Sequence, residues 1–206
     1  MTAPAHQSDP WQNRAPDPTA CGPDFGRLVE AVRRLQDSVV GIAAPDDAVQ
    51  VAAERIDEVA TSLLTWQVEE TARCAGRRLD LPGRGHPLLL PVAVDEQTAT
   101  TLRGRVTFTQ YYLGGNGAAH GGTVPLLFDE VLGQLVNASR VTVPARTAYL
   151  TVNYRAITPV DVELRLTASI DWSEGRKTWA TGRLHDGDRL VAEAEGLFVQ
   201  LRPGQP

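Results

Sequence analysis

A glycine-rich loop runs directly into a helical pattern between residues 116 and 137, and this stretch constrains the fold more than any other. From Val124 onward, apolar residues recur at helical spacing and form one stripe. Pro125 fits best in the first turn of a helix, where a missing amide hydrogen costs little. The pattern therefore predicts a helix that begins between Gly121 and Thr123, with its first amides unpaired within the helix.

One carboxylate lies on this predicted helix where a charged side chain is unusual. At about 100° per residue, Asp129 falls opposite the apolar stripe, among Leu126, Gly133 and Val136. A helix with two apolar faces is expected to pack against other parts of the protein on both faces. One of these packing partners can be a second subunit. Unpaired amides at a helix start can stabilise an oxyanion as well as a phosphate. The stretch fits an acyl-transfer site, but these residues alone favour a tight helix entry beside an Asp in a structural hydrogen bond.

Two segments resemble a known family. His120-Gly-Gly, six further residues and then Asp129-Glu are similar to the motif of hotdog-fold acyl-CoA thioesterases of the phenylacetate-pathway and thioesterase-superfamily-member type. Thr147-Ala-Tyr-Leu-Thr-Val-Asn-Tyr-Arg, followed by Thr158-Pro, resembles the next strand of that family. The resemblance covers residues 88–201. It implies an α+β hotdog fold, in which a curved antiparallel β-sheet wraps a long central helix.

The resemblance also implies catalytic roles. The Gly121 amide would polarise the thioester carbonyl, and Asp129 would act as a general base on water or as a nucleophile that forms an anhydride. Thr147 matches a Ser/Thr position that helps to hold the water or the carboxylate. His120 would order the loop or contact the thioester. Asn116 resembles the Asn or Gln often found shortly before the motif, at a looser spacing.

The implied substrate is an acyl-CoA, and the implied assembly is a homodimer or a dimer of dimers. In the family the motif loop comes from one subunit and the carboxylate from the other, at their interface. No cofactor is expected. Arginines near strand ends are candidates for the CoA phosphates, with Arg176 and Lys177 as further candidates. The expected substrate-binding residues are Gly122, Arg146, Tyr149 and Arg155.

Two other functions stay open. A non-catalytic acyl-CoA-binding or assembly protein would keep the same fold and pocket but hydrolyse nothing. A hotdog hydratase or dehydratase would place its Asp and His close together near a helix start, whereas here Asp129 follows His120 by nine residues.

Composition narrows the classes of function. The 206-residue chain has a formal net charge of −5, which gives no support to nucleic-acid binding, since that function favours a basic surface. Cys21 and Cys74 are far apart and form no metal or redox motif, and the four histidines lack a metal-ligand spacing. No apolar run approaches a membrane span, and the N-terminus does not resemble a secretory signal. We expect no metal, no membrane span and a cytoplasmic location.

The N-terminal part differs in character from the rest. Residues 1–23 are rich in Pro, Ala, Asp and Gln and are expected to form a disordered tail. Residues 24–87 are expected to be a helical extension and a loop, with helices predicted over 24–41 and 46–75. These helices would form a hairpin that packs on the core or its partner, either as a cover for the acyl tunnel or as a stabilising element. The arginines of the loop are expected to be solvated.

After residue 87 the pattern changes from helical to extended, and residues 88–206 are expected to form the hotdog domain. Asp186-Gly predicts a hairpin turn between the last two strands. In the strand that starts at Arg146, the even positions from Ala148 to Tyr154 are predicted to face the core, and odd positions such as Thr147 to face away. The expected strands are 89–94, 101–112, 146–156, 161–172, 177–185 and 189–201.

Overall fold

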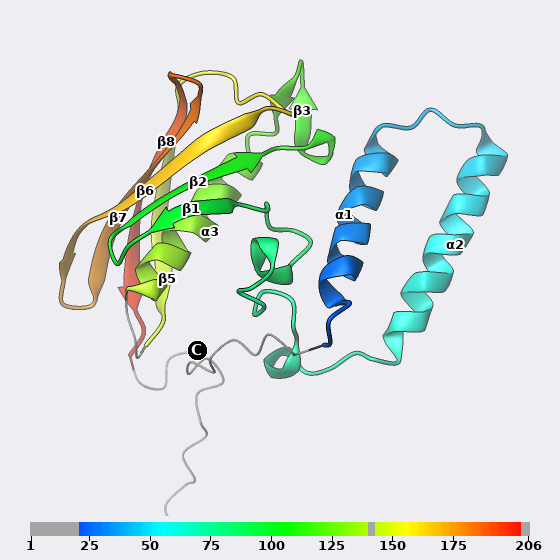
Figure 1. The fold of residues 1–206 in the computed structure, drawn as a ribbon, viewed down its shortest axis with the longest axis horizontal. Helices are drawn as coiled ribbons and strands as arrows, with labels where there is room; N and C mark the ends of the chain where they lie inside the picture. The colour runs from blue at the N-terminus through cyan, green and yellow to red at the C-terminus, as the bar shows by residue number, and fades with distance from the viewer. Residues whose placement is uncertain (1–20, 140–142, 203–206) are drawn as a thin grey trace, which may run out of the picture.

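The structure is a computed structural model that describes residues 21–139 and 143–202 of the chain. The expected N-terminal tail therefore lies outside the described residues, apart from its last three positions. Six antiparallel strands form one curved sheet in the order β1-β2-β6-β7-β8-β5, so β1 and β5 are its edges (Figure 1). A short ribbon of β3 (Leu113–Gly115) and β4 (Ala118–Ala119) stands beside it. The sheet strands are β1 (Ala93–Gln97), β2 (Thr101–Thr107), β5 (Ala145–Tyr154), β6 (Glu163–Glu174), β7 (Lys177–Asp186) and β8 (Arg189–Gln200).

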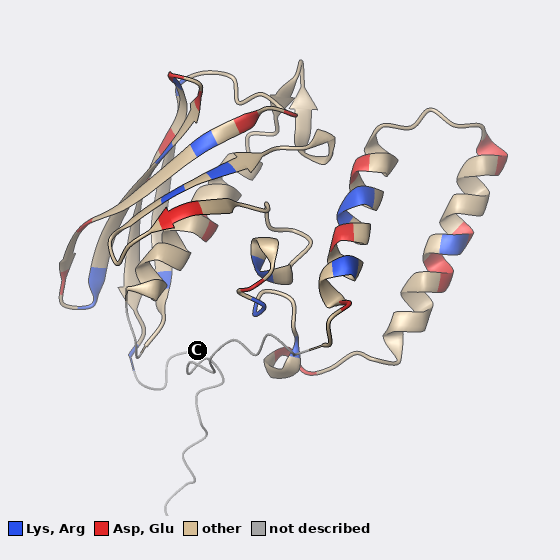
Figure 2. Ribbon diagram, in the orientation of Figure 1, with Lys and Arg blue, Asp and Glu red and all other residues tan. Residues whose placement is uncertain are grey.

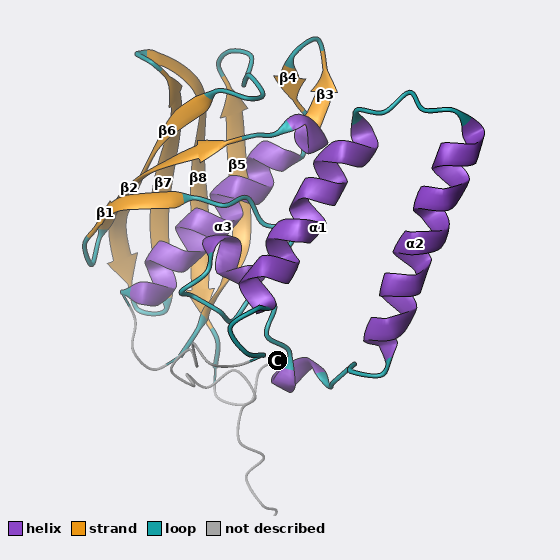
Figure 3. Cartoon of the chain, turned by 45° about the vertical axis from the view of Figure 1, so that its right-hand side comes forward, coloured by secondary structure: helices purple, strands orange, loops and turns teal. Residues whose placement is uncertain are grey.

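Helix α3 (Thr123–Ala138) lies against the concave face of the sheet (Figure 3). It begins where the sequence predicts, with Gly122 as its N-cap and Pro125 in its first turn. Its apolar stripe is buried against the inward side chains of the sheet, which makes one continuous core. This arrangement confirms the predicted α+β hotdog fold. The largest fully buried side chains include Phe108, Phe128, Phe198, Leu132, Leu164 and Leu184.

The N-terminal helices behave differently from each other. Helix α1 (Phe25–Val40) has the predicted bounds, and it docks on the loop before the sheet because the Arg33 guanidinium donates to the carbonyls of His86 and Leu89 at 3.1 and 3.2 Å. Helix α2 (Asp46–Leu64) ends well before the expected residue 75. It contributes no buried residue, so within one chain only α1 packs towards the core, with α2 beyond it (Figures 1 and 3).

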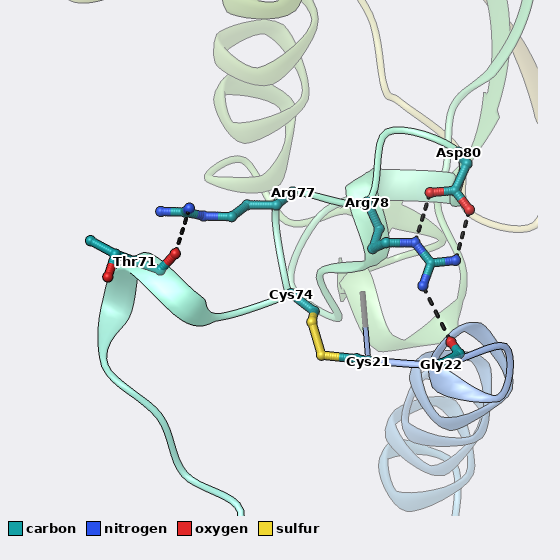
Figure 4. Close-up of a disulfide and its surroundings, with 7 residues drawn as sticks. All are labelled: Cys21, Gly22, Thr71, Cys74, Arg77, Arg78 and Asp80. Atoms are coloured by element: carbon teal, nitrogen blue, oxygen red, sulfur yellow. Dashed lines mark hydrogen bonds and ion pairs between the residues drawn. A yellow bond between two sulfur atoms is a disulfide. The ribbon is translucent and has the colours of Figure 1, made fainter. Parts of the chain in front are cut away.

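A disulfide joins the base of α1 to the loop that follows α2 (Figure 4). It pairs Cys21 with Cys74, two cysteines that form no recognisable motif in the sequence. Beside it, buried Arg78 donates through Nε and Nη2 to the Asp80 carboxylate at 2.8 and 2.7 Å. These hydrogen bonds lower the pKa of Asp80 below its ordinary value. The expectation that the loop arginines are solvated is therefore wrong for Arg78.

Two strand boundaries differ from the prediction for identifiable reasons, and one strand has an irregularity in its interior. The first strand begins only at Ala93, because Leu89 and Leu90 are buried in the loop before it. The second ends at Thr107, and the chain then turns through a short 3₁₀ helix, Gln110–Tyr112. In β6, an irregularity after Ile170 turns Trp172 away from the core; this ring is exposed and stacks on Trp179.

Acidic and basic residues are intermixed along the sheet and both N-terminal helices (Figure 2). Across residues 21–139 and 143–202, no helix combines the length and the apolar character that crossing a membrane requires.

Candidate functional site

An open cleft of about 1060 Å³ lies between α3, the start of β5 and the loop 79–84. Three of the expected site residues line it together: Asp129 from α3, and Arg146 and Thr147 from β5. Its size and its mixture of an apolar wall with a few polar groups suit a small-molecule ligand. The apolar wall includes Leu81, Leu90, Val92, Leu102, Val131 and Phe198.

The Asp129 carboxylate is held by one side chain across the cleft floor. Thr147 donates its hydroxyl hydrogen to Asp129 Oδ1 at 2.7 Å. The alternation of the strand predicts that Thr147 faces away from the helix, and the structure shows that this is wrong. A β-bulge between Thr147 and Tyr149 inserts one residue, so the odd positions face α3 before the bulge and the even positions face it afterwards. Leu150 and Val152 do pack on the core, as predicted.

A second polar contact forms one wall of the cleft. Arg84 forms an ion pair with the Glu130 carboxylate, with Nε and Nη2 at 2.6 and 2.7 Å from its oxygens. Its Nη1 also donates to the Gly76 carbonyl at 3.0 Å. Gln134 donates to the same carboxylate from the next turn of α3. The extension is thereby tied to the helix beside Asp129. Sequence reasoning missed Arg84 as a cleft residue, because its partner is 46 positions away.

The turn before α3 has its peptide groups held at nearly every position. The His120 carbonyl accepts hydrogen bonds from the amide and the hydroxyl of Thr123, at 2.9 and 2.7 Å. The Gly122 amide donates to His120 Nδ1 at 3.0 Å, and the Gly121 carbonyl accepts from the Tyr154 hydroxyl. Within the part of the chain that the structure describes, no acceptor meets the Gly121 amide. The predicted oxyanion donor is thus exposed and available.

Space near this turn requires glycine at position 114 and is tight at Gly122. A Cβ on Gly114 would lie 2.7 Å from His120 Cα, so only glycine allows the ribbon to approach the histidine backbone. A Cβ on Gly122 would lie 3.3 Å from His120 Nδ1. The His120 backbone is further held by its amide, which donates to the Tyr112 carbonyl at 2.7 Å. The loop is therefore packed tightly from two sides.

The remaining expected residues do not join the cleft. Asn116 occupies a left-handed turn at the tip of the β3–β4 ribbon, with φ of 51°, a conformation that Asn tolerates better than most residues. Arg155 pairs with Glu193 at 2.6 Å. Tyr149 is exposed on the edge strand. Among the described residues, no group of three or more His, Cys, Asp or Glu side chains could hold a metal ion.

The site residues fall into two groups that are separated along α3. Asp129, Thr147 and Arg146 line the cleft, whereas His120, Gly121 and Gly122 form the turn at the start of the helix. The six residue-to-residue steps from Thr123 to Asp129 alone span about 9 Å of helix rise. A single thioester group is too short to contact both the Asp129 carboxylate and the Gly121 amide of the same chain at hydrogen-bonding distance.

Comparison with known proteins gives the same fold and motif. The family model described as "Thioesterase superfamily" matches residues 116–194. Over 83 residues the chain is 36% identical to "Putative esterase PA0474" from Pseudomonas aeruginosa, which covers 40% of this chain and 62% of that protein. Over 95 residues it is 30% identical to acyl-coenzyme A thioesterase THEM4 from Xenopus laevis. This match covers 45% of this chain and 42% of that protein. The chain thus spans less than two thirds of either relative.

A solved structure extends the likeness beyond the sheet. The thioesterase superfamily protein RHA08564 is 29% identical, with a TM-score of 0.74 over 86% of this chain and 96% of that one. Since residues 88–206 make up less than two thirds of the chain, this match includes much of the N-terminal extension. With the central helix and the curved sheet in place, the chain has the hotdog fold, and its residues 116–194 match the thioesterase superfamily.

Proposed function

We propose that the protein hydrolyses acyl-CoA thioesters to the free acid and CoA, with Asp129 as the general base or nucleophile. The observation that carries this proposal is the carboxylate of Asp129, held by the Thr147 hydroxyl at 2.7 Å in a cleft that has both an apolar wall and polar groups. A fixed carboxylate beside an apolar pocket suits attack on a thioester whose acyl group is buried. The relatives' printed names agree with this chemistry at the level of the family.

The complete site is proposed to form between two copies of the chain. Asp129 is exposed in the single chain, and Leu126 and Gly133 on the same face are only half-buried. Strand β5 is an edge of the sheet, and an uncovered edge presents backbone groups that can pair with another strand. Pairing two copies in a two-fold dimer would bring the Gly121 turn of one to the Asp129 cleft of the other.

In this arrangement the residues divide the chemistry between the two protomers. The Gly121 amide of one protomer donates to the thioester carbonyl, and the bond strengthens as that oxygen becomes negative. Asp129 of the other protomer removes a proton from water, or attacks the carbonyl carbon itself. Thr147 fixes the carboxylate in either route. Arg146 also lines the cleft, and we propose that it contacts the CoA part of the substrate.

Measuring the release of CoA thiol from acyl-CoAs of increasing chain length tests the proposal. Asp129→Asn should lower turnover on the order of a hundredfold or more while the protein stays folded and dimeric. Asp188→Asn, at an exposed hairpin turn, is the matched control and should retain wild-type turnover. Binding of acyl-CoA without release of thiol would instead identify a non-catalytic binding protein, and hydration of an enoyl-CoA would identify a hydratase.

A further inference from the structure

The Gly121-Gly122 pair has a flexible backbone, so its peptide groups need contacts from other residues to stay in one orientation. Glycine has few steric limits on its backbone dihedrals, so the peptide groups of a Gly-Gly turn can rotate. If the peptide between Gly121 and Gly122 rotated, the Gly121 carbonyl oxygen could face the substrate, and it would repel a developing oxyanion. An oxyanion donor in such a turn is useful only if its neighbours are held in one orientation.

The structure holds the two peptide groups around Gly121 by different contacts. The group before Gly121 is fixed locally, because its His120 carbonyl accepts two hydrogen bonds from Thr123. The carbonyl of a trans peptide points opposite to its amide hydrogen, so these bonds aim the Gly121 N–H away from the helix. The group after Gly121 is held on its amide side by His120 Nδ1 and on its carbonyl side by the hydroxyl of Tyr154.

We propose that Tyr154 is a positioning residue for the reaction: its hydroxyl holds the Gly121 carbonyl towards β5 and so keeps that oxygen from turning towards the substrate beside the Gly121 amide. The contact joins residues 33 positions apart, and it is made from the last residue of the edge strand. The ring is half exposed, so its burial does not explain its presence there. This inference rests on the proposed thioesterase function, because it concerns the oxyanion donor of that reaction.

Tyr154→Phe removes only the hydroxyl and is the direct test. The expected result is a fall in kcat of about five- to tenfold with little change in KM, because a bond to the oxyanion is made mainly in the transition state. Tyr111→Phe is the matched control, since Tyr111 is also a half-exposed tyrosine, but its hydroxyl makes none of the contacts that hold the glycine pair among the described residues. Equal kcat for Tyr154→Phe and the wild type would overturn the proposal.

A double-mutant cycle shows whether Tyr154 acts through the Gly121 amide. Gly121→Pro removes the amide hydrogen, whereas Gly121→Ala keeps it and adds a Cβ only 3.8 Å from the Tyr154 oxygen, an ordinary contact. Tyr154→Phe should slow the Gly121→Ala protein by its usual factor but leave the Gly121→Pro protein unchanged, since without the amide hydrogen no oxyanion is held beside the Gly121 carbonyl. The same loss in both backgrounds would show that Tyr154 acts elsewhere.

Backbone NMR separates this proposal from the proposed function. In ¹⁵N-labelled protein, Tyr154→Phe should shift the amide signals of Gly121 and Gly122 and speed hydrogen exchange at Gly122 several-fold. Unchanged signals and exchange would overturn the positioning role even if the protein is an active thioesterase. A wild-type protein that releases no CoA would overturn the proposed function, and the NMR result would still decide whether Tyr154 orders the turn.

Discussion

Replacing Gly114 with alanine is expected to slow thioester hydrolysis without unfolding the protein. The new Cβ would lie 2.7 Å from His120 Cα, whereas ordinary contact begins at 3.4 Å, so the His120 backbone must retreat by about 0.7 Å. Gly121 is the next residue in the chain, and its amide would move with it. Because a misplacement of about 1 Å can cost about a hundredfold in rate, we expect kcat to fall by about 10- to 100-fold.

The assay is steady-state release of CoA thiol, with thermal unfolding measured on the same samples. Gly41→Ala is the matched control: its Cβ would lie 3.7 Å from the Asp37 carbonyl oxygen, in ordinary contact, at the end of α1. Gly41→Ala should keep the wild-type kcat. If Gly114→Ala also keeps it while remaining folded, the position of the His120 loop does not control the reaction, and the reasoning from the close approach is refuted.

Three further predictions concern the Cys21–Cys74 disulfide, the His86 side chain and the Thr147 hydroxyl that holds Asp129. Reducing the Cys21–Cys74 disulfide, which closes a loop of 53 residues, should lower the free energy of unfolding by up to about 4 kcal/mol in urea titrations, and two free thiols in the unreduced denatured protein would contradict it. Burial and then the charge of Arg84 lower the pKa of His86 below 6.5, so its contribution to stability is present above pH 6.5 and is lost as the pH falls towards the folded pKa. His86→Gln should therefore lose less stability than the wild type between pH 8 and 5.5, as measured by urea unfolding, and identical losses would exclude this group. Thr147→Val should lower kcat about tenfold and Thr147→Ser should restore most of it, whereas equal rates for all three proteins would remove the hydroxyl from the mechanism.

The central helix and most of the sheet could be predicted because their patterns are local. The stripe from Val124 to Leu135 has the helical period, and β6 from Leu164 to Ala168 alternates cleanly between buried and exposed positions. Pro125 indicated the start of the helix, because its fixed φ and missing amide hydrogen suit the first turn. Each of these signals depends on residues within a few positions of one another.

The features that were missed depend on residues far apart in the sequence. The bulge after Thr147 leaves no mark in the strand's composition, yet it reverses which positions face the helix. The contacts of Arg84 with Glu130 and of Tyr154 with Gly121 span 46 and 33 positions. Such pairs are set by the tertiary fold, so periodicity could not reveal them.

The helical extension shows a second limit of sequence patterns. The period of α2 predicts an amphipathic helix correctly, but the pattern does not say what covers its apolar face or where it stops. In the structure Thr65 caps the helix. The amides of Trp66 and Gln67 close the last turn by bonds to the carbonyls three residues before them, and the chain then leaves the helix. An apolar face predicts that a helix needs a neighbour, and only the assembled molecule identifies it.

Activity of a mixed dimer tests the shared site most directly. Asp129→Asn and Gly121→Pro chains with different affinity tags are co-expressed, and the dimer that carries one copy of each is purified. If the amide and the carboxylate come from different protomers, one of its two sites is intact, and it should show about half of the wild-type activity. Each variant alone should be nearly inactive. A mixed dimer no more active than the two parents would contradict a site built across the interface.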